Sequence, residues 1–358
     1  MKWPAHGSNP QYLYQSANLP VPDKYLDFSA NINPLGPPQA LKMKWPDFYD
    51  EISEYPDPLS LNFKKMIAGK EELSMDSILI GNGGAELITL IGRMLAGKNV
   101  LIVEPAFSEY EKACRANDCS IFYFHLHAPN WELNVKELDT FLDKVDAVFL
   151  CNPNNPSGVR FSFSTVFQIL EQCKQTETLL IVDEAFYDFL EDYEPISLLI
   201  RDYSNLIILR SMTKMFAIPG LRLGYTLAAP DTIEKLSVYQ SHWSVNAIAM
   251  LAGEVCLKEK SYVHETIRYI SKEREKLFSF FVKEDFLFSP SHVNFYLLQD
   301  PRQKEQFSFF TFLLQKGIVP RHTFNFPGLD GNWLRFAIKG EKDNERLMEV
   351  LSEWRQLH

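Results

Sequence analysis

The sequence predicts an α/β fold in which a large, mainly parallel sheet is covered by helices and followed by a smaller α+β unit. Between about residues 60 and 240, short apolar runs alternate with longer amphipathic stretches, as is typical of parallel strands buried on both faces. From about residue 262, a long amphipathic stretch precedes alternating strand-like and helix-like segments. A weakly periodic segment rich in Pro, Asn and aromatic residues comes first. We therefore expect an N-terminal arm (1–45), a large domain (46–255) and a small C-terminal domain (256–358).

The expected elements follow in chain order. In the arm, "PVPDKYLDFSANINPLGPP" indicates extended chain rather than a helical layer. In the large domain, residues 77–95 predict a strand, a glycine turn and a helix. Further strands and helices are expected in these segments: strands within 99–107, 146–158, 178–189 and 205–214, then helices at 262–281, 306–317 and 344–357 with strands at 293–299 and 333–339.

Composition restricts the classes of function. The 358 residues are 46% hydrophobic and 13% aromatic, which is enough to fill a sizeable core. A formal net charge of −10 argues against non-specific nucleic-acid binding, because such binding needs a basic surface. It leaves room for an anionic substrate, since a site can be locally cationic inside an acidic protein.

The five cysteines form no CxxC pair and no zinc-like spacing, so we expect free thiols in a reducing compartment. The first residues lack the apolar core of a signal peptide, and no apolar run approaches the roughly 20 residues of a membrane span. The expectation is a soluble, cytoplasmic protein without a membrane segment.

Polar residues gather where the predicted strands end. Ligands of open parallel sheets bind beyond the carboxyl ends of the strands, so these residues are considered together. After "SILI", Gly83 and Gly84 let backbone amides approach a ligand, and the helix that begins there adds its positive end. This turn is a plausible phosphate cradle, although tight packing of strand and helix is the commoner reason for a glycine turn taken alone.

Three further strand ends carry chemistry. Asn155 follows "AVFLC", Asp183 follows "LLIV", and Ser211, Lys214 and then Arg222 follow "LIILR". A lone Asp or Lys is more often part of a structural ion pair, but four such strand ends together predict a ligand site. Lys214 stands among apolar residues, and desolvation with nearby cations lowers the pKa of a lysine, so that its neutral amine can attack a carbonyl.

The order and spacing of these motifs resemble the fold-type I pyridoxal 5'-phosphate (PLP) enzymes, the aspartate aminotransferase superfamily, over nearly the whole chain. The resemblance implies PLP as cofactor, bound by the large domain, and implies that Lys214 forms the Schiff base with its aldehyde. It implies that Asp183 faces the pyridine nitrogen. A carboxylate about 4 Å from a pyridinium gains roughly 4 kcal/mol at an effective dielectric near 20, enough to keep the ring protonated at neutral pH.

The resemblance assigns the remaining cofactor contacts as well. Asn155 is implied to hydrogen-bond the phenolic oxygen, and Tyr110, in "EPAFSEY", to stack on the ring. The residues implied to hold the cofactor phosphate are Gly83, Gly84, Ser211 and Arg222. Tyr55, in "SEYPDP", matches a tyrosine that reaches the phosphate of the neighbouring subunit, so a homodimer is implied.

Two arginines near the end, Arg321 and Arg335, have the planar guanidinium that binds carboxylate or phosphate through two hydrogen bonds. Surface arginines are common, but Arg335 lies in the apolar run "WLRFAIK". Within the superfamily, the chain is similar to the family of L-threonine O-3-phosphate decarboxylases of cobalamin biosynthesis. The stretches that carry this similarity include "HGSN" at 6–9, "DFSANINPLG" at 27–36, "WSVNAIAMLAGEV" at 243–255 and "FPGLD" at 326–330.

This resemblance implies decarboxylation of a small phosphorylated amino acid to (R)-1-amino-2-propanol O-2-phosphate. Arg335 is implied to bind the substrate carboxylate, and Arg321 and His6 to bind its phosphate. Asn33 is implied to bind the substrate as well, and Asn31 and Asn33 are implied to lie in the arm that covers the site.

The alternative is a histidinol-phosphate aminotransferase, which also binds a phosphorylated amine and also has two C-terminal arginines. That family usually has Tyr at the position of Phe186 and Glu at the position of Ile32, and "HGSN" and "WSVNA" belong with the decarboxylases. One residue departs from the decarboxylase pattern, since Ser8 stands where Gly is common.

Other interpretations are weaker. A non-catalytic regulator of this fold usually carries an extra N-terminal DNA-binding module, for which the arm has no room, and Lys214 and Asp183 are intact. His125 and His127 have metal-like spacing on a predicted strand, but the sequence offers no nearby third ligand, so packed or solvated histidines and no metal site are expected. Cys151 is expected to be a small buried residue rather than a reactive thiol.

Overall fold

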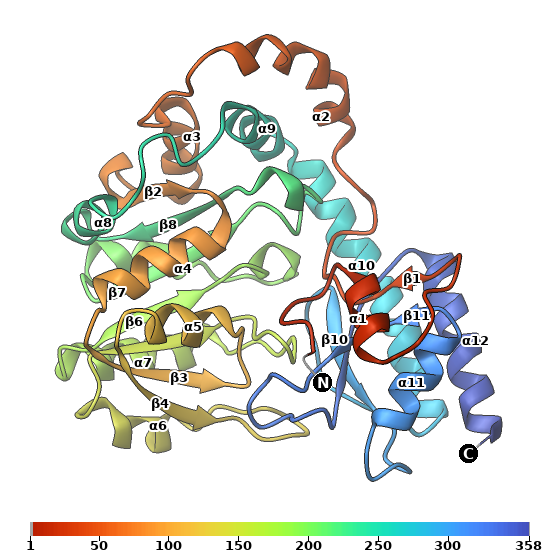
Figure 1. The fold of residues 1–358 in the computed structure, drawn as a ribbon. Coiled ribbons are helices and arrows are strands. Elements are labelled where there is room, and N and C mark those ends of the chain that lie inside the picture. The colour runs from red at the N-terminus through yellow and green to blue at the C-terminus, as the bar shows by residue number, and fades with distance from the viewer. Residues whose placement is uncertain (1–2, 358) are drawn as a thin grey trace.

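A seven-stranded sheet forms the centre of the computed structural model, which describes residues 3–357 (Figure 1). Its strand order is β2-β8-β7-β6-β5-β3-β4, and every strand except β8 runs in the same direction. The strands are β2 (Ile78–Gly81), β3 (Asn99–Glu104), β4 (Ser120–His125), β5 (Ala147–Cys151), β6 (Leu179–Asp183), β7 (Leu206–Ser211) and β8 (Gly224–Ala228). The predicted, mainly parallel α/β fold is confirmed.

β8 was not predicted, and β4 was predicted only as the strand that carries His125 and His127. β4 forms an edge of the sheet and is only partly buried, so it lacks a continuously apolar run. β8 is fully buried, but Gly224, Tyr225 and Thr226 interrupt its aliphatic character. Both strands depend on their neighbours in the sheet for a partner, which a local pattern does not report.

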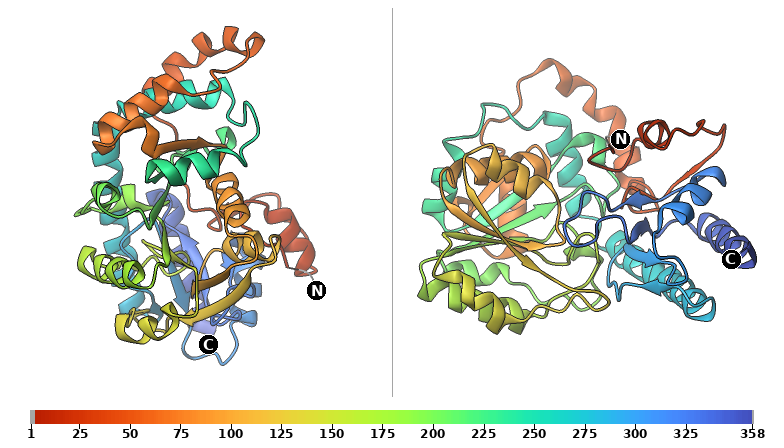
Figure 2. Two further views of the ribbon diagram at one scale, coloured as in Figure 1. Left: turned by 90° about the vertical axis from the view of Figure 1, so that its left-hand side faces the viewer. Right: turned by 60° about the horizontal axis from the view of Figure 1, so that its bottom comes forward.

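Helices cover both faces of the sheet (Figure 2). Successive residues of a buried strand enter opposite cores: Leu101 packs on one side, and Val100 and Ile102 pack on the other. One face is covered by α4 (Gly83–Met94), α5 (Glu109–Arg115) and α8 (Pro230–Ser237). The other is covered by α3 (Leu61–Glu71), α6 (Val135–Leu142), α7 (Phe163–Gln175) and α9 (Ala247–Leu257). Short 3-10 helices link these elements at Trp45–Phe48, Asp50–Ser53, Met75–Ser77, Tyr187–Phe189, Ser197–Arg201 and Pro219–Leu221.

The C-terminal part has its own four-stranded antiparallel sheet in the order β12-β13-β10-β9. Its elements are α10 (Lys260–Lys283), β9 (Leu287–Phe288), β10 (Phe295–Gln299), α11 (Phe307–Gln315), β11 (Ile318–Val319), β12 (Arg321–His322), β13 (Leu334–Ala337) and α12 (Glu341–Leu357). The helices and strands expected here are confirmed. The domain boundaries stay predictions, and the boundary after residue 255 falls inside α9.

The arm differs in part from its prediction as extended chain. It contains α1 (Pro10–Ser16) and α2 (Gln39–Lys44), and the segment between them includes β1 (Leu26–Asp27). α1 is too short to show a helical period, and it is held by tertiary contacts, because Tyr14 is buried and its hydroxyl donates to the carbonyl oxygen of Leu314. β1 pairs in parallel with β11, so the arm lies along the C-terminal part (Figure 1).

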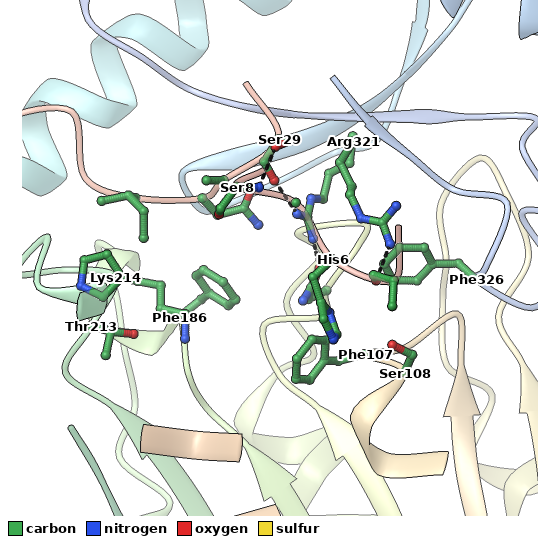
Figure 3. Close-up of a pocket in the computed structure, with 18 of the residues that line it drawn as sticks. His6, Ser8, Ser29, Phe107, Ser108, Phe186, Thr213, Lys214, Arg321 and Phe326 are labelled. Carbon is green, nitrogen blue, oxygen red and sulfur yellow. Dashed lines mark hydrogen bonds between the residues drawn. The ribbon is translucent and has the colours of Figure 1, made fainter. Parts of the chain in front are cut away.

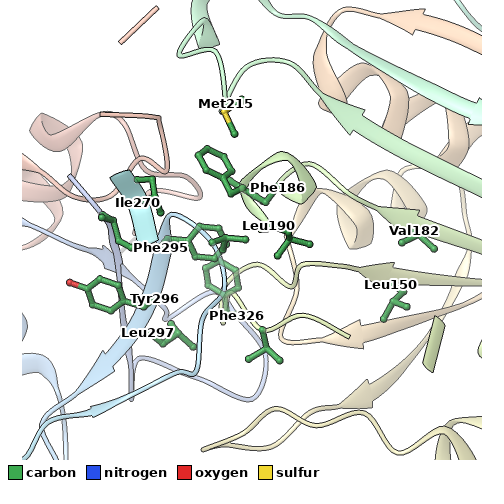
Figure 4. Packing of buried hydrophobic residues seen from close by; sticks show 14 of the residues in the cluster. Leu150, Val182, Phe186, Leu190, Met215, Ile270, Phe295, Tyr296, Leu297 and Phe326 are labelled. Carbon is green, nitrogen blue, oxygen red and sulfur yellow. The ribbon is translucent and has the colours of Figure 1, made fainter. Parts of the chain in front are cut away.

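One apolar cluster joins the two sheets (Figure 4). Leu150 and Val182 contribute from the large sheet, and Phe295 contributes from β10. The ring of Phe186 packs edge-on against Phe295, with ring centroids 4.7 Å apart. The relative position of the two parts is therefore set by a shared core, which fixes any group that lies between them.

The cysteines are free thiols, as the sequence predicts. All five cysteines are unpaired, and Cys151 is buried, as expected. His125 ends β4 and His127 lies beyond it, both exposed, so the two do not share a strand. Among residues 3–357, no helix is both long enough and apolar enough to cross a membrane.

A buried ion pair lies next to the ends of β6 and β7, where the predicted site residues Asp183 and Ser211 lie. Arg210 Nη2 lies 2.8 Å from Glu184 Oε2, and both side chains are about 1% exposed. Tyr193 donates a hydrogen bond to the same carboxylate. Burial raises the pKa of Glu184 to about 7, and Arg210 opposes that rise. Because the two residues adjoin Asp183 and Ser211 in sequence, the pair also holds the ends of β6 and β7.

We expect Arg210→Ala to lower the free energy of unfolding by about 3–5 kcal/mol, because it leaves Glu184 buried without its cation. Arg346→Ala is the control, because Arg346 pairs with Glu349 on the surface; it should cost no more than about 1 kcal/mol. Urea denaturation followed by circular dichroism measures both values. Equal losses in the two variants would contradict a stabilising role for the buried pair.

Candidate active site

Lys214 lies just beyond β7, at the edge of the large sheet. Its Nζ donates to Ser211 Oγ at 3.1 Å and lies 5.8 Å from the centroid of the Phe186 ring. Burial lowers the pKa of Lys214 to about 8; nearby Arg222 lowers it further, and Asp183 opposes both effects. A substantial fraction of the amine is therefore neutral near neutral pH, as a nucleophilic lysine requires.

Asp183 ends β6 and is buried. Its Oδ2 accepts a hydrogen bond of 2.5 Å from the hydroxyl of Tyr110, and its Oδ1 accepts one of 2.9 Å from the backbone N–H of Ala185. Burial raises the pKa of Asp183, while these donors and Lys214 act in the opposite direction. The ring of Tyr110 stacks on Phe149, with centroids 5.0 Å apart. Stacking of Tyr110 on a cofactor ring stays a prediction.

The glycine turn between β2 and α4 faces Arg222. Gly83 has a φ of +77°, and a Cβ there would lie 2.6 Å from Arg222 Nη2, so no other residue fits without displacing the guanidinium. A Cβ on Gly84 would meet nothing within 4 Å. Because β8 runs antiparallel to β7, Arg222 before β8 lies at the same edge of the sheet as the carboxyl ends of the other strands.

Two buried arginines lie opposite each other on the small sheet. Arg335 on β13 pairs in register with Arg321 on β12. Arg335 donates from Nη1 to Asn155 Oδ1 at 2.6 Å and from Nη2 to the carbonyl oxygen of Ser29 at 2.9 Å. Arg321 donates from Nη2 to the carbonyl oxygen of Ala5 at 2.7 Å.

Neither Arg321 nor Arg335 forms an ion pair with an acidic side chain within residues 3–357. Burial lowers the pKa of Arg335 to about 10, and burial together with Arg335 lowers that of Arg321 to about 9. Two like charges buried side by side are costly, so this arrangement favours binding of an anion.

A cavity of about 280 Å³ connects the lysine to these arginines (Figure 3). Lys214 lies on one side of it, and Arg321 and His6 lie on the other. The predicted site residues that line it are His6, Asn155, Lys214, Arg222, Arg321 and Arg335. Residues from the arm, the large sheet and the small sheet therefore meet in one place.

The other predicted site residues lie outside the cavity lining. Gly83 packs against Arg222 and Ser211 accepts a hydrogen bond from Lys214, and both of these partners line the cavity. Asp183 lies near enough to Lys214 for its charge to raise the pKa of that lysine, and Gly84 follows Gly83 in the turn. Asn33 was predicted to contact substrate, but it does not line the cavity. Its Nδ2 donates to the Met215 carbonyl oxygen and to the hydroxyls of Tyr262 and Thr266, so its side chain anchors the arm instead.

Tyr55 lies away from the cavity, as a residue that serves a neighbouring subunit would. Its side chain is 81% exposed, and its ring lies 4.8 Å from that of Trp243, which is also exposed.

Sequence reasoning missed Ser29 and Asp27. Asp27 Oδ1 accepts from the hydroxyl of Ser29 at 2.6 Å, and the Ser29 hydroxyl oxygen accepts from the N–H of Ser8. Asp27 also raises the pKa of Arg335, against the effect of burial. Ser8 has a φ of +72°, in the region that favours glycine, which gives a physical reason why the decarboxylase pattern has Gly there. Both residues lie in the motif "DFSANINPLG", but the motif does not show that Asp27 lies near Arg335, which belongs to a distant segment of the chain.

Asn31 lines the cavity and its Oδ1 is buried without a hydrogen-bond partner among the described residues. Of the two asparagines in the arm motif "DFSANINPLG", Asn31 lines the cavity and Asn33 does not.

A nucleophilic lysine, a strand-end carboxylate and a glycine turn at one sheet edge, facing two buried arginines, define a fold-type I enzyme of the aminotransferase class. The model of the family described as aminotransferase class I and II matches residues 23–351, and the chain belongs to this family.

Three known proteins illustrate the similarity. The threonine-phosphate decarboxylase of Salmonella typhimurium is 35% identical over 97% of this chain and 95% of its own. The structure of the histidinol-phosphate aminotransferase from Clostridium acetobutylicum is 32% identical, has a TM-score of 0.88, and covers 93% of this chain and 100% of its own. The histidinol-phosphate aminotransferase of Sinorhizobium meliloti, solved in complex with pyridoxal-5'-phosphate, shares the fold with a TM-score of 0.86 at 20% identity, covering 98% of this chain and 95% of its own.

We expect Lys214 to react with aldehydes with a pH midpoint near 8, because only its neutral amine is nucleophilic and burial lowers its pKa. Reductive methylation with formaldehyde at a series of pH values, quantified by peptide mass spectrometry, measures the midpoint. Ordinary surface lysines in the same sample serve as the reference, with a midpoint near about 10.4. A Lys214 midpoint equal to theirs would contradict the expectation.

Proposed function

We propose that the protein is a PLP-dependent decarboxylase that converts L-threonine O-3-phosphate into CO2 and (R)-1-amino-2-propanol O-2-phosphate for cobalamin biosynthesis. One observation carries the proposal: a single cavity is lined by Lys214 and by the buried Arg321 and Arg335, and neither arginine has an acidic partner within residues 3–357. The substrate has the matching groups, since it combines an amine with a carboxylate and a phosphate.

The residues at the sheet edge fit PLP. When bound, PLP supplies a conjugated ring that accepts the electron pair left on the substrate's α carbon. Lys214 would hold its aldehyde, and Asp183 would face its ring nitrogen. Asn155 Oδ1 already accepts from Arg335, so its amide nitrogen remains to donate to the phenolic oxygen. The cofactor phosphate would be held by Gly83, Gly84, Ser211 and Arg222. Glycine suits position 83, because a side chain there would collide with the guanidinium of Arg222.

The arginines would decide which bond breaks. Arg335 would bind the substrate carboxylate beside Asn155, and Arg321 with His6 would bind the phosphate. Holding both anionic groups would fix the orientation of the α carbon, so that its bond to the carboxylate rather than its bond to hydrogen is the one that breaks. CO2 would leave, and the α carbon would take up a proton in its place.

Histidinol-phosphate aminotransferase is the second candidate, because a structure of that name matches the chain closely. Two cavity residues argue against it. Phe186 and Ile32 both line the cavity, where the aminotransferases usually have the hydroxyl of Tyr and the carboxylate of Glu.

A homodimer is proposed because Tyr55, implied to serve the neighbouring subunit, is exposed among other exposed apolar side chains. These include Met43, Trp45, Tyr49, Ile52 and Leu59. A cytoplasmic location and the lack of nucleic-acid partners stay predictions that rest on the free thiols and the net charge of −10.

The PLP-loaded protein should release CO2 from L-threonine O-3-phosphate. Lys214→Ala should abolish release, and Arg335→Ala should lower kcat/KM about 100-fold, because a charge-assisted anchor is lost. Arg346→Ala, an exposed arginine, should leave kcat/KM unchanged. Glutamate formed from histidinol phosphate and 2-oxoglutarate, without CO2 release, would establish the aminotransferase instead.

Hybrid dimers should show that Tyr55 acts across the interface. Lys214→Ala and Tyr55→Ala subunits are each expected to be poorly active alone. In a hybrid, the subunit with intact Lys214 receives an intact Tyr55 from its partner, so mixing the two variants should restore up to a quarter or so of wild-type CO2 release, as random pairing gives. Activity no higher than that of the separate variants would mean that Tyr55 acts within its own subunit or not at all.

A further inference from the structure

The first described residues form a strap across the cavity, here called the N-terminal strap (residues 3–8). Its beginning is fixed to the C-terminal part. Trp3 packs against a group of rings: Phe307, Phe310, His322 and Phe324. His322 Nε2 donates to the carbonyl oxygen of Pro4 at 2.9 Å, and Arg321 donates to that of Ala5.

The end of the strap is fixed elsewhere. A Cβ on Gly7 would lie 2.5 Å from the carbonyl oxygen of Ser29, which follows β1. The strap therefore passes too close to this segment for residue 7 to have a side chain. The N–H of Ser8 donates to Ser29 Oγ. Between these contacts, His6 reaches across the cavity to the large sheet's side, where Nε2 lies 2.9 Å from Glu109 Oε1.

Glu109 is the first residue of α5 and is mostly buried, with a side-chain exposure of 19% against 46% for His6. The ring of His6 also lies against Phe107, with centroids 5.6 Å apart. The contact between His6 and Glu109 therefore joins the strap, which the C-terminal part holds, to the helix that carries Tyr110.

The chemistry of this contact restricts His6. A carboxylate oxygen accepts hydrogen bonds but does not donate them, so Nε2 must carry the proton. Nδ1 is then the ring nitrogen available to a ligand. A phosphate oxygen is also an acceptor, so Nδ1 must be protonated to bind it, and His6 would bind phosphate as an imidazolium between two anions.

We propose that Glu109 is a positioning residue that holds His6, and with it the N-terminal strap, over the phosphate end of the cavity. The proposal rests on the proposed function for the identity of the phosphorylated substrate. Glu109 acts through His6 and does not itself touch substrate. Its negative charge, as well as its oxygen, is needed, because it stabilises the imidazolium.

Two neighbours on α5 provide matched controls. Lys112 Nζ lies 3.4 Å from Glu109 Oε2 in an exposed pair, and Glu111 pairs with Arg115 at 2.5 Å. If Glu109 merely formed a surface ion pair, Lys112→Ala would have the same effect as Glu109→Gln. Glu111→Gln removes the same charge from the same helix without involving His6.

The experiment compares CO2 release by the PLP-loaded wild-type protein, Glu109→Gln and both controls. Glu109→Gln should raise KM for L-threonine O-3-phosphate about tenfold with kcat within about twofold, as loss of one charge-assisted contact predicts. Both controls should keep the wild-type KM. The absorbance band of the bound cofactor should not change, which excludes an effect through Tyr110.

Calorimetry with inorganic phosphate on the PLP-loaded protein gives a readout that does not need turnover. PLP fills its own phosphate site, so the titration reports the second site, where Glu109→Gln should raise Kd about tenfold. In the double variant, Glu109→Gln should add nothing to the rise in Kd caused by His6→Ala alone, because the two residues act as a unit.

The outcomes separate the two proposals. Wild-type protein that binds phosphate but releases no CO2 would refute the proposed function, and the calorimetric comparison would still decide the role of Glu109. Unchanged phosphate affinity and KM in Glu109→Gln would overturn the positioning role. An equal effect of Lys112→Ala, or full additivity with His6→Ala, would overturn it as well.

Discussion

Parallel pairing of β5, β6 and β7 is the constraint on which the site depends. The pairing places Cys151 beside Asp183 and Asp183 beside Leu209, so the residues that follow these strands emerge at one edge. β8 runs the other way and returns Arg222 to that edge. Backbone hydrogen bonds among these buried strands therefore set the positions of the amine of Lys214, the carboxylate of Asp183 and the guanidinium of Arg222.

The site brings three cationic side chains together, and burying their charges lowers the stability of the fold. Lys214, Arg321 and Arg335 all line one cavity, and burial lowers the pKa of each. The buried pair of Arg210 and Glu184 behind the sheet is different, because each charge there has its partner. Arg321 and Arg335 have no acidic partner within residues 3–357. Backbone carbonyls accept their hydrogen bonds instead, while their charge stays available to an anionic ligand.

The arm closes the site and also belongs to its framework. Its carbonyl groups at Ala5 and Ser29 hold the two arginines, and the amide of Asn33 ties it to the segment after Lys214. A single stretch of chain thus touches the lysine's loop and both arginines. The shared core around Phe186 and Phe295 keeps these groups at fixed separation (Figure 4). Substrate specificity is consequently a property of the junction between three parts of the chain.

The sequence by itself determined the large sheet, most of its strands, and the residues at their ends. Continuous apolar runs mark buried parallel strands, and the polar residues after them stand out by contrast. Resemblance to a known family then supplied roles for Lys214, Asp183 and the arginines.

Only the tertiary structure decided which groups meet. β4 and β8 needed their neighbours in the sheet, and α1 needed the surface on which it packs. Asn31 rather than Asn33 reaches the cavity, although the two are only two positions apart and no local sequence pattern distinguishes them. The contact of His6 with Glu109 joins residues 103 positions apart. Such contacts arise when distant segments pack, and no periodicity in the chain records them.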